Sequence, residues 1–228
     1  MANRFVYKAS ETAPFYKAVD TEFDWFGGFA LAQKRRCIES LHNAFHKKHA
    51  ELTVLEVSSK GKEELGNKLS AFNLLLKDEN EAKTVEALFQ GSKVFRSEQD
   101  NTLHQCSEAY SMTPRDAKHF VRSFMENEGR SFSFHGFSFR GTDFSREPKD
   151  YFYNWLYISA LKSNPELGEA LIKYDAFTDI EFNPAKQYNC QAIACAIFVG
   201  LTRAGKLDEA LQSPEDFLKI VYGKTPSF

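Results

Sequence analysis

Three polar side chains near the middle of the chain have types and spacing suited to acid–base and nucleophilic chemistry. Glu86, Gln90 and Lys93 follow one another at intervals of four and three residues, so on a helix they lie on one face. Thr84 is a suitable N-cap, and we expect a helix over residues 84–95. A carboxylate there can act as a base and an amine as a cation or nucleophile. A solvated helix face with a weak Glu–Lys network is the alternative.

A second group of carboxylates lies far downstream, at Asp179 and Glu181. If residues 178–182 are extended, these two side chains share one face and Ile180 takes the other. One or both then line a pocket. The alternative is a loop in which the carboxylates make structural caps.

Other catalytic and metal-binding patterns are missing from the sequence. Histidines at 42, 46 and 49 have no carboxylate nearby to complete a metal site, so an exposed polar face is favoured, and we expect no metal and no cofactor. Cys190 and Cys195 lie in an apolar segment, where small buried thiols are common. The four cysteines form no C-x-x-C pair, which favours reduced thiols over a disulfide framework or a zinc site.

A basic amphipathic helix is expected over residues 29–48, with its apolar positions on one stripe. The opposite face is expected to carry five cations: Lys34, Arg35, Arg36, Lys47 and Lys48. The formal net charge of the chain is only −2, so bulk charge does not hold a polyanion. Any contact with a DNA backbone must be local, and this helix is the candidate for a weak, salt-sensitive contact.

The remaining elements indicate a helix-rich α+β fold with a few short strands. Strands are expected within 51–57 and 69–76, and Gly136 suggests a bulge or tight hairpin within 131–140. Three further helices are expected to begin after N-cap-plus-proline pairs, and the apolar segments 151–161 and 190–201 are expected to be buried helices. We expect a single domain over 1–228, with 1–60 as an N-terminal extension and 69–207 as the core.

The composition indicates a globular protein with an aromatic core. The 22 Phe, nine Tyr and two Trp residues favour packed rings and an aromatic-walled pocket. No apolar run approaches the length of a membrane span, and the first twelve residues have no apolar signal-peptide core. We therefore expect a soluble, cytoplasmic protein that does not contact membranes.

Several stretches resemble motifs of one family, in family order. The stretch from Leu69 to Asn73 is similar to L/F-S-N-F, the stretch from Glu86 to Lys93 to E-x-x-F-Q-x-x-K, and the stretch from Thr113 to Lys118 to S-P-x-x-A-K. Residues 151–171 and 188–192 match two further helical motifs. On these residues the chain resembles the NADAR family, named for its association with NAD and ADP-ribose chemistry, over residues 69–207.

The closest resemblance is to the NADAR subgroup associated with DarT-type toxins, which ADP-ribosylate DNA. The basic N-terminal helix and the runs 152–157, 175–184 and 189–192 carry it. Where other branches have D-x-x-W-G, this chain runs through residues 182–186 without it, as that subgroup does. The resemblance implies an antitoxin-like hydrolase that strips ADP-ribose from modified guanine in DNA, and it makes a DarT-type toxin a possible partner. A non-catalytic module that binds ADP-ribose, NAD or the toxin itself is the alternative.

Cleaving an N-glycosidic bond to ribose builds positive charge on the sugar, so a carboxylate is needed near the anomeric carbon. Glu86 is the first candidate as charge stabiliser or base, because the first turn of a helix favours its ionised form. Asp179 is the second catalytic carboxylate. Lys93 either holds the diphosphate as a cation or, when deprotonated, attacks C1 of the ring-opened ribose to give a Schiff base.

Substrate contacts are expected from polar and aromatic residues around these three. Phe89 or Trp155 would stack on adenine, although core packing is the better reading for each ring taken singly. The base must leave the stack to enter a pocket, so single-stranded DNA should be preferred. The expected substrate-binding residues are Ser70, Asn73, Phe89, Gln90, Trp155, Glu181, Asn183 and Asn189.

Overall fold

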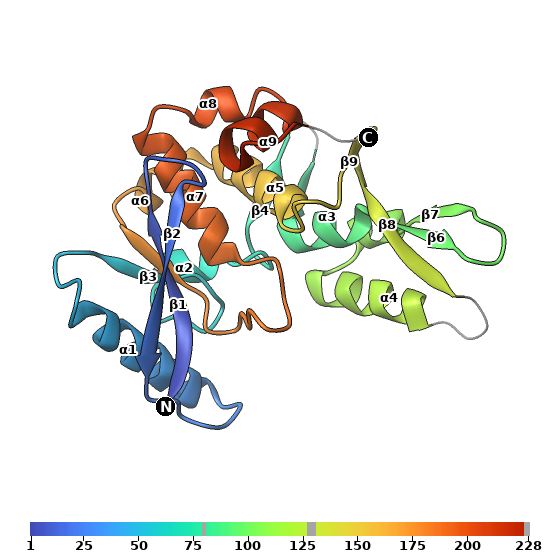
Figure 1. The fold of residues 1–228 in the computed structure, drawn as a ribbon. Coiled ribbons are helices and arrows are strands. Elements are labelled where there is room, and N and C mark those ends of the chain that lie inside the picture. Colours follow the sequence, from blue (N-terminus) through green and yellow to red (C-terminus); the bar gives the residue numbers. More distant parts are fainter. Residues whose placement is uncertain (79–80, 127–130, 226–228) are drawn as a thin grey trace.

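The N-terminal part of the chain builds a four-stranded sheet with order β2-β1-β10-β3. In the computed structural model, which describes residues 1–78, 81–126 and 131–225, β1 (Ala2–Ala9) and β2 (Tyr16–Phe23) form an antiparallel hairpin. The short strand β10 (Ala176–Thr178) pairs antiparallel with β1 and parallel with β3 (Val54–Glu56). Segments more than a hundred residues apart thus meet in one sheet, as Figure 1 shows.

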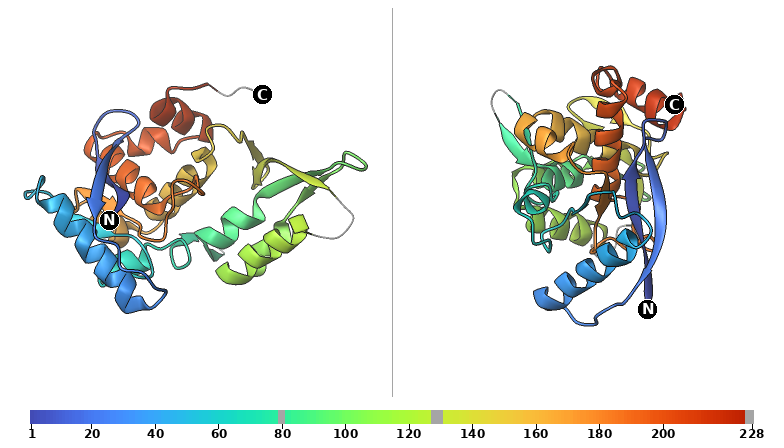
Figure 2. Two further views of the ribbon diagram at one scale, coloured as in Figure 1. Left: turned by 60° about the horizontal axis from the view of Figure 1, so that its bottom comes forward. Right: turned by 90° about the vertical axis from the view of Figure 1, so that its left-hand side faces the viewer.

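Helix α1 (Leu31–His46) lies beside this sheet (Figures 1 and 2). Its buried residues Cys37, Ile38, Leu41 and Phe45 share a small core with Val6 of β1. The prediction of a helix in 29–48 is confirmed, and so is the strand within 51–57. The hairpin was not predicted from the sequence.

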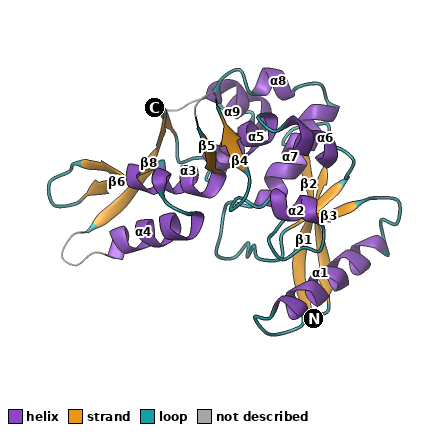
Figure 3. Cartoon of the chain, turned by 180° about the vertical axis from the view of Figure 1, so that it is seen from behind, coloured by secondary structure: helices purple, strands orange, loops and turns teal. Residues whose placement is uncertain are grey.

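A second sheet, with order β7-β6-β8-β9, lies at the other end of the molecule (Figure 3). It contains β6 (Lys93–Ser97), β7 (Leu103–Gln105), β8 (Phe132–Phe139) and β9 (Thr142–Phe144). Val94 and Phe95 of β6 pair with Gly136 and Phe134, so His135 is an extra residue in β8. The bulge expected at Gly136 is therefore present.

Three buried helices connect the two sheets. Helices α5 (Tyr151–Lys162) and α7 (Gln191–Arg203) confirm the two apolar helices expected from the sequence, and α3 (Val85–Gly91) packs against α5. The other elements surround them: α2 (Glu64–Lys68), β4 (Leu75–Lys77), β5 (Ala82–Thr84), η1 (Ser107–Ser111), α4 (Pro114–Glu126), α6 (Pro165–Leu171), α8 (Leu207–Ala210) and α9 (Pro214–Tyr222). The α+β class is confirmed.

Two expected elements are wrong in their extent. The segment 69–76 is mostly a turn, because the N–H groups of Asn73 and Leu74 both donate to the Ser70 carbonyl, and only Leu75–Lys77 is a strand. The helix expected over 84–95 ends at Gly91, where a Cβ atom would lie 2.4 Å from the Tyr110 ring. Lys93 consequently begins strand β6 instead of completing a helical face.

The expected N-terminal extension, residues 1–60, supplies three of the four strands in the first sheet. Strand β10 from the expected core lies between β1 and β3. Strands from both sides of the expected boundary at residue 60 therefore belong to one continuous sheet. The division into extension and core stays a prediction. Among the described residues, no helix has the length and apolar character needed to cross a membrane.

Candidate functional site

A buried chain of hydrogen bonds joins Glu86, Gln90 and Lys93. The Gln90 side-chain amide donates to Glu86 Oε1 over 2.8 Å, and Lys93 Nζ donates to Gln90 Oε1 over the same distance. Glu86 is only 8% exposed and Gln90 5%. The reading of these residues as a solvated helix face is therefore wrong. The amide fixes the carboxylate and the amine relative to each other, even though Lys93 lies on a strand.

The surroundings of Lys93 lower the pKa of its amine. Burial lowers the pKa of the amine, and the nearby charge of Lys118 lowers it further, while Glu86 and Cys106 oppose the shift. Lys93 Nζ also lies 4.9 Å from the centre of the Phe89 ring. A desolvated amine with a lowered pKa is the form that nucleophilic catalysis requires.

A turn at residues 70–73 holds the first turn of α3 in place. The Glu86 N–H donates to the Ala71 carbonyl over 3.0 Å. The Ala71 N–H in turn donates to Gln191 Oε1, and Gln191 Nε2 donates to the Val57 carbonyl over 2.6 Å. The turn therefore links α3 to the start of α7 and the end of β3.

The same turn presents an aromatic ring at the surface. Phe72 is 39% exposed, and Lys118 Nζ of α4 lies 6.0 Å from its ring centre. Because Lys118 also affects the pKa of Lys93, the Phe72–Lys118 pair lies beside the buried hydrogen-bond chain. An exposed ring next to an exposed cation suits a nucleotide with its phosphates.

Asp179 follows β10 and is partly recessed from the surface. Burial and the neighbouring charge of Glu56 raise the pKa of its carboxyl group to about 8, against opposing N–H groups of Glu181 and Phe182. An acid with this pKa is protonated at neutral pH, so Asp179 can donate a proton.

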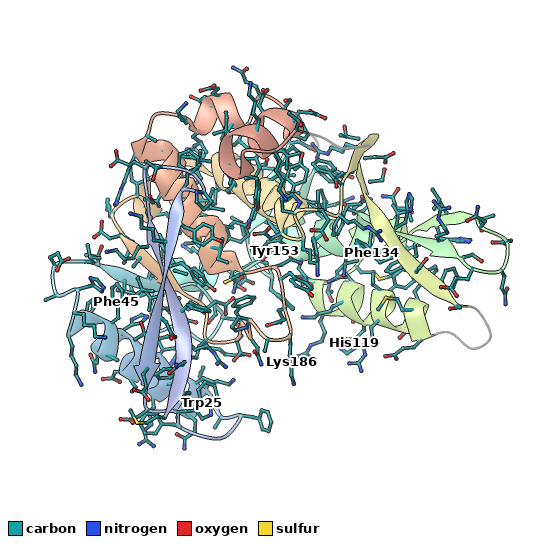
Figure 4. The ribbon with its side chains drawn as sticks, in the orientation of Figure 1. Trp25, Phe45, His119, Phe134, Tyr153 and Lys186 are labelled. Atoms are coloured by element: carbon teal, nitrogen blue, oxygen red, sulfur yellow. The ribbon has the colours of Figure 1, made fainter. Side chains whose placement is uncertain are left out.

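Tyr153 of α5 is affected by the charges of both Glu86 and Asp179. Its ring meets that of Phe89 edge-on, with 5.3 Å between ring centres. Burial raises the pKa of its hydroxyl well above the ordinary value, and the charges of Glu86 and Asp179 both add to this rise. Figure 4 shows Tyr153 near the middle of the molecule. Its hydroxyl thus lies within electrostatic range of both carboxyl groups.

The expected pairing of Asp179 and Glu181 on one extended face is wrong. The chain turns after β10: the Phe182 N–H donates to the Asp179 carbonyl, and the Glu181 N–H donates to Asp179 Oδ1 over 3.0 Å. Glu181 points elsewhere and forms an ion pair with Lys34, 2.8 Å from its Nζ. The short polar side chain of Asp179 stabilises the turn.

The two aromatic residues expected to stack on adenine pack against other rings. Phe89 is 6% exposed and packs against Phe137 and Phe152, so it belongs to the core. Trp155 contacts Phe139 and Phe144 of the second sheet, and its indole N–H is buried without a partner in the described chain. Neither ring offers a free stacking surface beside Lys93.

Four polar candidates lie on the segments around the site. Ser70 is buried, and Asn73 is exposed and donates to the Asn67 carbonyl. Asn183 organises a turn by accepting from the Ala185 N–H. The side-chain oxygen of Asn189 is buried and has no hydrogen-bond partner among the described residues. A buried acceptor without a donor fits a position that a bound ligand would complete.

The five cations expected on one face of α1 point in different directions. Lys34 pairs with Glu181, and the Arg35 side chain lines a hollow with His42 and Glu56. Arg36 and Lys47 border another hollow with acidic residues, whereas Lys48 follows the helix end and is exposed. The expectation of a single basic face is therefore wrong.

The histidines of α1 have structural partners. His42 Nε2 lies 2.8 Å from Thr178 Oγ1, and His46 Nε2 lies 3.0 Å from the Leu52 carbonyl. In the described ranges, no cluster of three histidine, cysteine or acidic side chains has metal-binding geometry.

Three residues of this region were not selected from the sequence. Phe72 and Tyr153 each lie inside a stretch that carried the family resemblance, and Glu56 is a single charge within the apolar run 54–57. A charged residue in an otherwise apolar strand was the available signal for Glu56, because such a group is rarely buried without a specific partner.

Comparison with known proteins gives one match that covers nearly the whole chain. A model of the NADAR-DarT1 family, described as DarT1-associated NADAR antitoxin, matches residues 2–227. No curated protein matches the chain.

Proposed function

The chain belongs to the family of DarT1-associated NADAR antitoxins, and from this premise we propose that it removes ADP-ribose from guanine in DNA that a DarT-type toxin has modified. The observation that carries the proposal is the buried chain Glu86–Gln90–Lys93, with both hydrogen bonds at 2.8 Å. It joins a carboxylate to an amine of lowered pKa. Reversal of the modification on DNA is sufficient for an antitoxin role, so the proposal needs no direct contact with the toxin.

Burial of Lys93 favours the covalent route over a purely electrostatic one. In that route the ribose C1–O4 bond opens and its oxygen takes a proton, and the neutral amine adds to C1. The bond from C1 to the guanine nitrogen then breaks, and the nitrogen keeps the electron pair and receives a proton. Water hydrolyses the resulting Lys93–C1 imine, which releases ADP-ribose and restores the amine.

The carboxyl groups divide the acid and base work of these steps. Glu86, fixed by the Gln90 amide, stabilises positive charge at C1 and accepts the proton that the attacking amine or water loses. Asp179, whose pKa is raised to about 8, supplies a proton to the leaving guanine. A carboxyl group with this raised pKa is suited to the role of the acid.

Binding of the ADP-ribose moiety is assigned to the surface beside Lys93. Phe72 would stack on a base, and Lys118 would hold the diphosphate as a point charge. The exposed cations Arg36, Lys47 and Lys48 remain the candidates for a weak contact with the DNA backbone.

The test is turnover on a single-stranded oligonucleotide that carries ADP-ribosylated guanine. The wild-type chain should release free ADP-ribose and unmodified DNA. Glu86→Gln should lower kcat by about 10²- to 10⁴-fold with the fold retained, as is typical when an acid–base or charge-stabilising group is removed. The matched control is Glu64→Gln, because the Glu64 side chain is 81% exposed and pairs only with the surface residue Lys68 among the described residues.

The alternative function has a distinct outcome in the same assay. Tight retention of ADP-ribose or of the modified oligonucleotide without release would identify a binding module. Inhibition of the toxin by the chain in the absence of modified DNA would identify a protein-binding antitoxin. Either result would overturn the proposed hydrolysis.

A further inference from the structure

Glu56, whose charge helps to raise the pKa of Asp179, is a carboxylate at the end of β3 that is only 4% exposed. It accepts hydrogen bonds from the hydroxyl groups of Ser58 and Thr178, each over 2.6 Å, and from the Ile180 N–H over 2.9 Å. In the described part of the chain, no lysine or arginine forms an ion pair with it. Its charge is stabilised by three neutral donors instead.

Two of these donors flank Asp179 in the sequence. Thr178 precedes Asp179 and Ile180 follows it, so the Glu56 carboxylate accepts from the Thr178 side-chain hydroxyl on one side of Asp179 and from the Ile180 backbone N–H on the other. Helix α1 also holds Thr178 in place, because His42 Nε2 lies 2.8 Å from Thr178 Oγ1. The Thr178 hydroxyl donates its single proton to Glu56 and therefore accepts from His42.

The support from α1 adds no positive charge. Burial lowers the pKa of His42 to about 4, and the charge of His46 contributes, so the ring is neutral at pH 7 and its proton lies on Nε2. The charge of Glu56 acts on Asp179, and the cations Arg35 and Lys62 line the same hollow as Glu56 without forming an ion pair with it among the described residues. The charges of Glu56 and Asp179 disfavour each other, so the pair favours a single negative charge over two.

The hydrogen bonds decide which carboxyl group holds that charge. Burial raises the pKa of both groups, but the Glu56 oxygens accept from two hydroxyls and one N–H. Among the described residues, the Asp179 carboxyl group accepts from the Glu181 N–H over 3.0 Å, and the Phe182 N–H, which bonds the Asp179 carbonyl, also lowers its pKa. The charge of Glu56 is stabilised by more hydrogen bonds than a charge on Asp179 would be, so the proton stays on Asp179.

We infer that Glu56 is a positioning residue, which fixes the turn that carries Asp179 and keeps the proton on the Asp179 carboxyl group for delivery to the leaving guanine. When the bond from C1 to the guanine nitrogen breaks, the nitrogen takes the electron pair and this proton, and Asp179 becomes a carboxylate. Solvent returns the proton after the product has left. The inference rests on the proposed function, because the proton has a destination only if the glycosidic bond is cleaved.

Other groups that act on Asp179 come from several elements and must be kept intact in any test. The charged or titratable neighbours are Glu56 on β3, Glu181 on the same turn, Tyr7 on β1, Tyr153 and Tyr157 on α5, and Cys190 and Cys195 at the start of α7. Lys34 acts through its ion pair with Glu181, and His42 through Thr178.

The first test is the pH dependence of kcat for the wild-type chain and for Glu56→Gln. The wild type should lose activity on the alkaline side with a midpoint near pH 8, the pKa of Asp179. Removal of the Glu56 charge should move this midpoint down by about one unit, which is a typical effect of a close like charge. Turnover at pH 8 should then fall about 5-fold more than turnover at pH 6. Glu64→Gln should leave the midpoint unchanged.

A milder variant and a direct titration keep the inference testable if Glu56→Gln fails to fold. Ser58→Ala removes one donor from Glu56 and should move the midpoint in the same direction by a smaller amount. Carbon-13 NMR of the Asp179 carboxyl group in the full chain should report the same shifts without any turnover. Active enzyme with an unchanged alkaline midpoint in both variants would overturn the inference. A complete lack of hydrolysis by the wild type would overturn the proposed function instead, and the NMR titration would still decide whether Glu56 keeps Asp179 protonated.

Discussion

Replacing Gln90 by methionine tests whether the central amide holds the catalytic groups in place. Methionine has a similar length but can form neither of the two 2.8 Å hydrogen bonds, to Glu86 and from Lys93. Each bond has a charged partner, so each contributes about 1.5–3 kcal/mol to stability. Lys93 keeps some access to water, and we therefore expect a loss near the lower end, about 3 kcal/mol for both. A domain with about 5–15 kcal/mol of stability remains folded after such a loss.

The effect on catalysis should exceed the effect on folding. Without the amide, the carboxylate and the amine lose their fixed separation, and a displacement of about 1 Å at a reacting group costs about 100-fold in rate. Turnover on the modified oligonucleotide and urea unfolding should be measured on the same preparation. The control is Gln105→Met, because Gln105 also bridges backbone carbonyls, at Gly91 and Ser138, without touching Glu86 or Lys93.

A double-mutant cycle of Gln90→Met with Lys93→Met gives the sharpest form of this test. Both changes remove the same hydrogen bond, so their combined loss of stability should be smaller than the sum by about 1.5 kcal/mol. Wild-type turnover in Gln90→Met, or losses that add within about 0.5 kcal/mol, would refute the reasoning that the amide couples the two groups.

Three further predictions concern the chemistry, the pH dependence of stability and the DNA contact. Lys93→Arg should abolish turnover but retain ADP-ribose binding, and borohydride reduction during turnover should add one ADP-ribose mass at Lys93; partial activity of the arginine variant without any trapped mass would instead assign an electrostatic role. Folding raises the pKa of Asp179 from 3.8 to about 8, so the folded state binds more protons between these values, and the Tm should fall as pH rises from 5 to 8. Asp179→Asn should reduce this fall, and an unchanged slope in thermal unfolding scans would contradict the raised pKa. Reversing the charges of Arg36, Lys47 and Lys48 together should raise KM for modified DNA and leave activity on a free ADP-ribosylated nucleoside nearly unchanged, whereas equal losses on both substrates would reject a DNA contact there.

The hydrogen-bonded group of Glu86, Gln90 and Lys93 could be predicted from the sequence because its spacing is local. Thr84 caps α3 through the Ala87 N–H, as its residue type indicates, and the four-residue interval brings Gln90 to Glu86. Lys93 reaches Gln90 for a different reason from the one expected. The chain leaves the helix at Gly91 and enters β6, but an interval of three residues is short enough for the long lysine side chain to return.

The burial of these three side chains could not be deduced from their spacing. It depends on Tyr110, Tyr153 and the turn at residues 70–73, all of which approach α3 from other parts of the chain. The N-terminal hairpin was missed for a similar reason. Its strand β1 is stabilised by pairing with β10, and a sequence window of a few residues contains no information about that partner.

The two halves of the site differ in how far apart their residues lie along the chain. Glu86, Gln90 and Lys93 fall within eight positions, whereas the hydrogen bonds from Glu56 to the Asp179 turn span up to 124 positions. Contacts of such long range require closure of a large loop and form slowly. During folding the part of the site with Glu86 and Lys93 should therefore form early. Asp179, the proposed proton donor, should join it only when β10 docks between β1 and β3. A folding intermediate that already contains helix α3 would bind or react poorly, and enzymatic competence would serve as a late marker of the folding pathway.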